Sequence, residues 1–259
     1  ARAMSLLGLI TGLGPILAPQ IGGLLLLIAD WRAIFWLLCV LSLLCCTVTY
    51  ATLRESIPEQ RGVAVGPRLW LNLLTDRRFL RFSLPCTLIQ ASVFAYLSGA
   101  PYVFIDLLKL TPQQFAWAFG VNAVGLMIAG RVNAHLVIRL GPERIFRRAM
   151  LGTAAMGVVL AGVAFVGRGG LWALAVPLFF FVSSLAFNFA NGFALALAPF
   201  GASAGTASAF YGTLHFSAAG LAGVAFSALY DNSARAMTGV MCVVTLAGVM
   251  LYRYLDRSS

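Results

Sequence analysis

Charged residues are scarce in this chain. They occupy 10% of its 259 positions, whereas apolar residues occupy 61%, and the mean hydropathy is +0.91. Soluble domains are about half apolar and about a quarter charged. A water-soluble protein of this composition would expose too much apolar surface to stay dispersed. The composition therefore excludes an ordinary soluble domain and favours a protein whose solvent is the lipid bilayer.

Lysine is almost absent, although the chain has a net charge of +10. Lys109 is the single lysine, and the other basic residues are arginines that fall between apolar runs. They form no basic stripe interleaved with aromatic residues, so we expect no nucleic-acid partner. A Gly-x4-Gly-Lys-Ser/Thr phosphate loop is also missing, so we expect no ATP hydrolysis. The arginines are typical of loops beside lipid headgroups.

Signals for disulfides, metals and cofactors are missing as well. No pair of cysteines has Cys-x-x-Cys spacing, and each cysteine lies inside an apolar run, which is typical of small buried side chains. We therefore predict no cofactor and no metal site. The chain begins with Ala1 and shows no signal peptide, so we expect its natural N-terminus to lie upstream. The five cysteines are Cys39, Cys45, Cys46, Cys86 and Cys242.

Long apolar runs dominate the chain. A helix needs about 20 apolar residues to cross the hydrocarbon core, and runs of this length without period-two alternation exclude a membrane β-barrel. The sequence thus predicts an all-α polytopic membrane protein with about eight transmembrane helices. These are expected at about 4–28, 32–53, 79–104, 113–138, 145–167, 170–194, 204–230 and 236–255.

Basic residues are unevenly divided between the two ends of these runs. If the first span starts in the cytoplasm, thirteen arginines lie in inside segments and four basic residues lie in outside loops. An excess of basic residues marks the cytoplasmic side. Both termini and residues 54–78 are therefore predicted to be cytoplasmic. The four outside residues are Arg32, Lys109, Arg168 and Arg235.

The 54–78 segment is the longest connection and divides the chain into two spans before it and six after it. Transporters built from two six-span halves carry a long cytoplasmic loop between the halves. We therefore interpret residues 1–53 as the last two helices of an N-terminal six-helix bundle. Residues 54–78 are then the central cytoplasmic loop, and residues 79–259 are the C-terminal six-helix bundle. On this interpretation four helices would precede the chain.

The first predicted span carries closely spaced small residues and prolines. Small residues four apart let a second helix approach closely, and prolines kink a span. A kinked helix with a small packing face explains the pattern, but its arrangement also resembles the antiporter motif of drug:proton antiporters in the major facilitator superfamily. Ala18 stands where that motif has a glycine. The residues are Gly14, Pro15, Ala18, Pro19, Gly22 and Gly23.

Other segments resemble the Bcr/CflA-type multidrug resistance branch of that superfamily, in order and in spacing along all 259 residues. The segments include Trp31-Arg-Ala-Ile-Phe-Trp36, Leu53-Arg-Glu-Ser-Ile-Pro58, Tyr96-Leu-Ser-Gly-Ala-Pro-Tyr102 and Ala204-Gly-Thr-Ala-Ser-Ala209. The resemblance implies the major facilitator fold, here partial, and a multi-pass location in a bacterial inner membrane. It also implies an antiporter that exports small lipophilic compounds or drugs in exchange for protons.

A further segment resembles a degenerate copy of the superfamily's cytoplasmic loop motif, Asp-Arg-x-Gly-Arg-Arg. It comprises Arg139, Gly141 and Arg144 between the fourth and fifth predicted spans. Ile138 occupies the usual position of the aspartate, so a charge relay that needs an acid there is not expected. A positive-inside loop explains the same residues equally well.

Carboxylates are missing from the middle of every predicted span, since all eight acids lie in loops or at span ends. In the resembled family, protons and cationic drugs are handled by acidic residues of the N-terminal half. His215 is the best titratable candidate within a span, because histidine can exchange protons near neutral pH. Ser208 and Tyr211 share its helix face at helical spacing.

Polar and aromatic side chains form stripes on several otherwise apolar spans. Such stripes face the interior of a helix bundle, where they either bond a neighbouring helix or line a cavity. Both interpretations stay open at this point. An aromatic and polar wall would suit lipophilic drugs. The candidate cavity-lining residues are Gln90, Phe94, Tyr96, Asn122, Ser184, Asn188, Asn191, Tyr211 and His215.

Gly201-Ala-Ser203-Ala-Gly205 matches the Gly-x-Ser-x-Gly nucleophile elbow of hydrolases. That elbow needs a strand-to-helix turn, whereas membrane helices flank this segment. His215 lies about 18 Å farther along the same predicted helix, too far to take the serine proton, and no acid is placed to orient it. We therefore interpret the segment as a turn and do not predict an enzyme.

The sequence favours secondary transport by alternating access of two helical bundles around a midplane site. Its expected partners are small lipophilic substrates, protons and the lipid bilayer. The alternative is a truncated, non-transporting membrane protein or an assembly partner. Because two helices cannot replace a bundle of six, we expect the 259-residue chain on its own not to carry out coupled transport.

Overall fold

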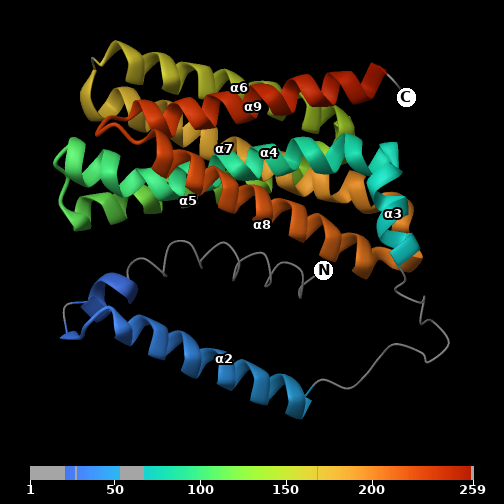
Figure 1. Ribbon diagram of the computed structural model, residues 1–259, viewed down its shortest axis with the longest axis horizontal. Coiled ribbons are helices and arrows are strands. Elements are labelled where there is room, and N and C mark those ends of the chain that lie inside the picture. Colours follow the sequence, from blue (N-terminus) through green and yellow to red (C-terminus); the bar gives the residue numbers. More distant parts are fainter. Residues whose placement is uncertain (1–20, 27, 53–66, 168, 258–259) are drawn as a thin grey trace. The chain divides into compact units, whose positions relative to one another are not determined.

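A computed structural model describes residues 21–26, 28–52, 67–167 and 169–257 (Figure 1). Every regular element within these ranges is a helix. Helices suit the bilayer because each one satisfies its own backbone hydrogen bonds. The predicted all-α polytopic class is confirmed.

Seven helices in the described ranges are long and apolar enough to cross a membrane. They correspond to the last seven predicted spans, with ends shifted by only a few residues. The predicted span 4–28 lies mostly outside the described residues. The seven are α2 (Arg32–Thr52), α4 (Arg77–Pro101) with the π-helical turn η2 (Tyr102–Leu107), α5 (Pro112–Leu140), α6 (Pro142–Val166), α7 (Gly170–Leu197), α8 (Ala204–Leu229) and α9 (Arg235–Arg257).

The chain separates into two compact units, residues 1–64 and 65–259. In the described part of the first unit, α2 is the long helix. Of the predicted antiporter motif, Gly22 and Gly23 lie in the helical residues 21–26. Gly14, Pro15, Ala18 and Pro19 lie outside the described residues, so the packing role of the motif stays a prediction.

In the described part of the second unit, the six long helices α4 to α9 form a bundle (Figure 1). Helix α4 packs against α7, α8 and α9, while α7 also packs against α5 and α6, and α6 packs against α9. Side chains that are fully buried between these helices include Phe79, Ile89, Phe146 and Met241. Most of the core therefore forms around α4 and α7.

A short helix that the sequence interpretation missed, α3 (Pro67–Thr75), lies in the segment predicted as the central loop. Its nine residues are far fewer than a membrane span needs, so a search for long apolar runs passes over it. Trp70 of α3 meets Phe210 of α8 edge to face, with 5.3 Å between the ring centroids. This contact attaches α3 to the end of the bundle.

Local signals explain where several helices begin. The carboxylate of Asp76 accepts a 2.8 Å hydrogen bond from the backbone N–H of Phe79 and caps α4. Thr111 and Gln114 form a reciprocal capping box at the start of α5. These caps satisfy backbone donors that have no partner within the helix.

Gly141 alone joins α5 to α6, and its φ of +75° is strained for any residue with a side chain. The turn between α8 and α9 is held differently, by hydrogen bonds from the hydroxyl and backbone N–H of Ser233 to Asp231. The hydroxyl hydrogen bond, above all, lowers the pKa of the exposed Asp231 carboxyl below its usual value. The two turns fix how consecutive helices reverse direction.

Candidate functional site

A cavity of about 350 Å³ lies between the middle of α4, the second half of α7 and the first half of α8. We call it the central pocket. It contains three of the sequence-predicted lining residues, which the structure brings together from two helices distant in sequence. The lining residues are Gln90 of α4, Phe189, Ala190 and Phe193 of α7, and Tyr211 and His215 of α8.

Aromatic rings surround His215 in this pocket. The rings of Tyr211 and His215, one helical turn apart, lie 4.1 Å apart between centroids. Phe193 meets Tyr211 edge to face at 5.2 Å, and Phe189 lies 6.2 Å from His215. The two phenylalanines carry no polar signal, so a search for polar stripes missed them. The pocket therefore combines apolar ring surface with a few polar atoms.

His215 is 8% exposed, and its buried Nε2 atom has no hydrogen-bond partner in the described part of the chain. A buried polar atom without a partner is costly and usually signals a ligand, a water or a functional role. Imidazole nitrogen can donate or accept a hydrogen bond, depending on its protonation. His215 is thus placed to bond a polar group that enters the central pocket.

Phe94 lies one turn along α4 from Gln90 but lines neither the central pocket nor the cleft described next. Its ring lies 6.3 Å from that of Phe216 on α8, edge to face. Phe216 is 69% exposed. Phe94 therefore packs between α4 and α8 beside the pocket.

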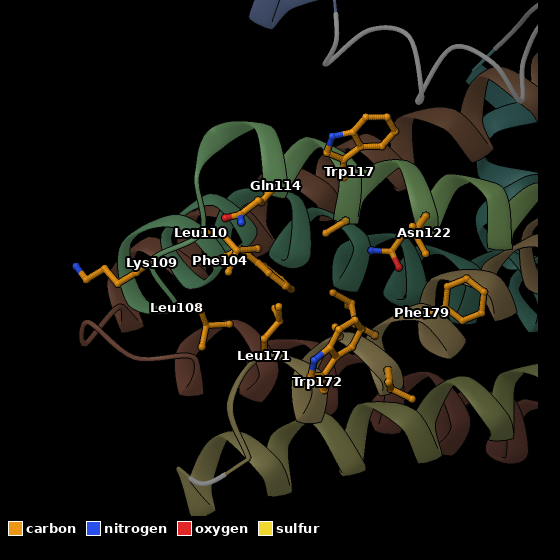
Figure 2. Close-up of a pocket in the computed structure, with 15 residues that line it drawn as sticks. Phe104, Leu108, Lys109, Leu110, Gln114, Trp117, Asn122, Leu171, Trp172 and Phe179 are labelled. Atoms are coloured by element: carbon orange, nitrogen blue, oxygen red, sulfur yellow. The ribbon is translucent and has the colours of Figure 1, made fainter.

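A larger cleft of about 720 Å³ lies between the first halves of α5 and α7 (Figure 2). We call it the Trp172 cleft. Figure 2 shows Asn122 of α5 and Trp172 of α7 on opposite sides of it, while the amine of Lys109 points away. Phe104, Trp117 and Phe179 add further aromatic surface to its walls.

Of this lining, the sequence interpretation identified Asn122 alone. Trp117 and Trp172 are 67% and 74% exposed. Tryptophan near the ends of membrane spans is typical of the bilayer interface, and this was the signal that could have indicated the cleft. These exposed rings leave the cleft open at the surface of the bundle.

Tyr96 and Asn122 connect α4 to α5. The Asn122 amide donates a 3.1 Å hydrogen bond to the Tyr96 hydroxyl, and both side chains are buried. The Tyr96 ring also stacks on Phe119, with 6.0 Å between centroids. Tyr96 thus joins two helices, and Asn122 both joins them and lines the Trp172 cleft.

Ser184 and Asn188 of α7 bond to α6 at a shared partner, Thr153. The Asn188 amide donates to the Thr153 hydroxyl at 2.7 Å, and the Ser184 and Thr153 hydroxyls lie 2.6 Å apart. Thr153 and Asn188 are completely buried. Neither predicted residue lines the central pocket or the Trp172 cleft, and their cavity-lining role stays a prediction.

Asn191 makes the corresponding connection from α7 to α5. Its amide donates a 2.7 Å hydrogen bond to the side-chain oxygen of Asn133. Both residues are buried and neither lines those two cavities. Membrane helices commonly use such amide pairs to hold a bundle together.

The predicted loop motif lies where α5 turns into α6. Gly141 makes that turn, Arg139 is exposed at the end of α5, and Arg144 is exposed in the first turns of α6. Close by, Arg81 of α4 forms ion pairs with Glu143 and Asp256 and donates a 3.2 Å hydrogen bond to Tyr252. Arg81 therefore joins the ends of α4, α6 and α9.

The acids that the structure describes all lie at or near helix ends. Asp76 precedes α4, Glu143 is in the first turn of α6, and Asp256 is in the last turn of α9. No group of three or more histidine, cysteine or acidic residues that would hold a metal occurs within the described ranges. Ser203 of the hydrolase-like segment ends the 3₁₀ turn η3 (Ala198–Ser203) between α7 and α8.

Comparison with known proteins identifies the family. Residues 1–224 match the model of the Major Facilitator Superfamily. The chain is 28% identical to the uncharacterized MFS-type transporter YdgK of Bacillus subtilis over 220 residues, covering 83% of this chain and 54% of that protein. It is 24% identical over 259 residues to the bicyclomycin resistance protein homolog of Haemophilus influenzae, covering 98% and 65%.

A third relative is the multidrug resistance protein MdtL of Citrobacter koseri, 23% identical over 216 residues, with 82% of this chain and 53% of that protein covered. The chain thus spans between about half and two thirds of the length of these relatives. These similarities are those expected of a Bcr/CflA-type drug transporter sequence. The helical bundle, the membrane-spanning lengths and the family match together place the chain in the Major Facilitator Superfamily.

Proposed function

We propose that this chain is part of a secondary active transporter that exports small lipophilic compounds by alternating access. The observation that carries the proposal is the central pocket, in which aromatic rings lie beside the buried His215 and its unpartnered Nε2 atom. Transporters of this kind bind substrate near the bilayer midplane between two bundles that rock against each other. The 65–259 bundle would be one of these bodies.

The lining of the central pocket indicates the substrate class. Phe189, Phe193 and Tyr211 offer apolar ring surface, while Gln90 and His215 offer hydrogen bonds. Drug-sized ligands bind in pockets that are mostly apolar, with a few polar groups that fix their orientation. A flat lipophilic molecule with one or two polar atoms fits this description.

The Trp172 cleft supports the same substrate class. Its exposed tryptophans offer apolar ring surface to a lipophilic compound. The cleft lies at the Lys109 end of the bundle, which the positive-inside rule predicts to be outside. We therefore propose the central pocket as the transport site and the cleft as the position from which an exported molecule leaves.

Proton exchange is the proposed driving force. Among the described residues, no carboxylate lies in the middle of a span, so His215 is the buried group best suited to take up a proton there. The expected cycle is that a proton and the substrate bind the bundle alternately.

The proposal is tested in everted membrane vesicles that contain the protein expressed from its complete natural reading frame. An imposed pH gradient should drive uptake of a fluorescent lipophilic cation, and collapse of the gradient by nigericin should stop it. His215→Asn keeps a polar side chain but cannot exchange protons near neutral pH. We expect it to reduce uptake about a hundredfold or more, the scale of a lost proton-transfer group.

His135→Asn is the matched control. His135 is the only other histidine; it is exposed on α5, where its ring bonds the backbone carbonyl of Arg131. Its substitution should leave uptake unchanged. Gradient-driven uptake that survives His215→Asn would remove His215 from the coupling mechanism. Normal membrane insertion with no uptake at all would favour a non-transporting membrane protein.

A further inference from the structure

Four arginines line a third cavity, at the end of the bundle where α6 begins and α9 ends. The two helices pack against each other there and lie side by side in Figure 1. The cavity has a volume of about 490 Å³. Arg147 and Arg148 of α6 line it, together with Arg253 and Arg257 of α9.

The positive charge of these arginines is not compensated within the described part of the chain. None of the four forms a salt bridge there. One acid lines the cavity, Asp256, and its carboxylate is already paired with Arg81 of α4. Four guanidinium groups around one cavity repel each other, so an anion between them would be stabilised.

A neighbouring cavity of about 270 Å³ lacks such a large excess of positive charge. It is lined by Arg81, Arg144 and Arg147 together with two acids, Glu143 and Asp256. Positive and negative side chains are nearly balanced in that cavity, and Arg81 pairs with both acids. The excess of positive charge therefore belongs specifically to the cavity between α6 and α9.

Apolar side chains form the deeper part of the same cavity. Leu151 lies one turn farther into the membrane than Arg147, and Val249 lies one turn farther in than Arg253. Met150 adds a third apolar contact. A cavity with cationic groups at its rim and apolar groups below matches a molecule with an anionic head and a hydrocarbon tail.

We propose that this cavity binds one anionic phospholipid, with the phosphodiester between the arginines and an acyl chain against Leu151 and Val249. Guanidinium groups form paired hydrogen bonds with phosphate oxygens. Basic pockets between membrane helices at a membrane surface are suited to anionic headgroups. A free phosphate ion would satisfy the arginines but would leave the apolar part of the cavity unused.

The site is tested by native mass spectrometry of the purified chain after incorporation into nanodiscs of phosphatidylcholine with a minor fraction of phosphatidylglycerol. The wild-type chain should retain phosphatidylglycerol in preference to phosphatidylcholine. Each basic residue near an anionic lipid surface contributes about fivefold in affinity. Arg147→Gln and Arg253→Gln should therefore each lower the preference about fivefold, and the double variant about 25-fold.

Arg78→Gln with Arg139→Gln is the matched control. Both residues are exposed at the same end of the bundle, and neither lines the cavity. This pair removes the same charge and should leave the preference unchanged. An equal loss in the control pair would overturn the site, because general surface charge would then explain retention. The two single variants keep the test decisive if the double variant does not fold.

A second arm distinguishes a lipid from a free anion. The thermal midpoint of the detergent-purified chain is measured with added phosphatidylglycerol and, separately, with inorganic phosphate at the same concentration. Phosphatidylglycerol should raise the midpoint, and Arg147→Gln should reduce the rise. An equal rise with inorganic phosphate would overturn the lipid assignment and indicate a site for a free anion.

Discussion

Single polar side chains hold neighbouring helices of the bundle together. Thr153 of α6 is the clearest case, because its hydroxyl accepts from Asn188 and lies 2.6 Å from the hydroxyl of Ser184. All three residues lie where no water is expected to replace a lost hydrogen bond. In a membrane interior such bonds add to helix packing because the hydrophobic effect does not favour one apolar neighbour over another.

Thr153→Val should destabilise the bundle, because it leaves the buried Asn188 amide without its partner on α6. The expected cost is about 1–2 kcal/mol of unfolding free energy, measured by thermal or denaturant unfolding in detergent. Thr213→Val is the control, since the exposed Thr213 hydroxyl bonds only the Ala209 carbonyl of its own helix. Equal effects of the two substitutions would contradict a role for Thr153 between helices.

At the scale of elements, close approach at a glycine sets the packing of α7 against α4 and α6. A side chain at Gly192 would overlap the sulfur of Cys86 on α4 and would lie 2.9 Å from the ring of Phe146 on α6. Small residues at helix contacts allow backbones to approach closely in membranes. The close packing at Gly192 therefore requires a glycine, whereas a glycine that faces open space could be replaced without overlap.

Gly192→Ala should cost about 1–3 kcal/mol, the usual range for an overpacked core. The same unfolding measurement with Gly162→Ala provides the comparison, because a side chain at Gly162 of α6 meets no atom within 4 Å. That control should be neutral or stabilising by up to about 1 kcal/mol, since alanine favours helix more than glycine does. Similar losses at both positions would mean that α7 is not closely packed at Gly192.

At the scale of the whole molecule, the distribution of the arginines predicts the orientation in the membrane. Arg144, Arg147, Arg148, Arg253 and Arg257 gather at the end of the bundle where α6 begins and α9 ends. Lys109 lies in the connection between η2 and α5, just before α5 begins. Arg144 lies just after the other end of α5, in the first turns of α6. The positive-inside rule predicts that the arginine-rich end faces the cytoplasm.

Cysteine labelling tests this orientation. With the five native cysteines replaced by alanine, a membrane-impermeant maleimide added to intact cells should label Lys109→Cys. It should label Arg144→Cys only after the membrane is permeabilised. The reverse pattern would show that the charge asymmetry does not set the orientation of this chain.

The sequence alone determined the fold class, the family and the positions of seven spans. A span is a local property, because about 20 consecutive apolar residues suffice to favour a helix in the bilayer, whatever its neighbours are. The order and spacing of short segments likewise indicated the superfamily, because both can be recognised along the chain without knowing which helices pack together. The nine residues of α3 were missed because a short helix carries no such long signal.

Only the tertiary structure decided what each polar stripe faces. Asn188 and Asn191 lie nearly one turn apart on α7, yet the first bonds Thr153 of α6 and the second bonds Asn133 of α5. Gln90 and His215, in contrast, meet in the central pocket from helices far apart in the sequence. A polar stripe shows only that a face is turned inward, because a neighbouring helix and a cavity satisfy the same hydrogen bonds equally well. The choice between them depends on which helices pack together, and that is fixed by contacts between residues distant in the chain.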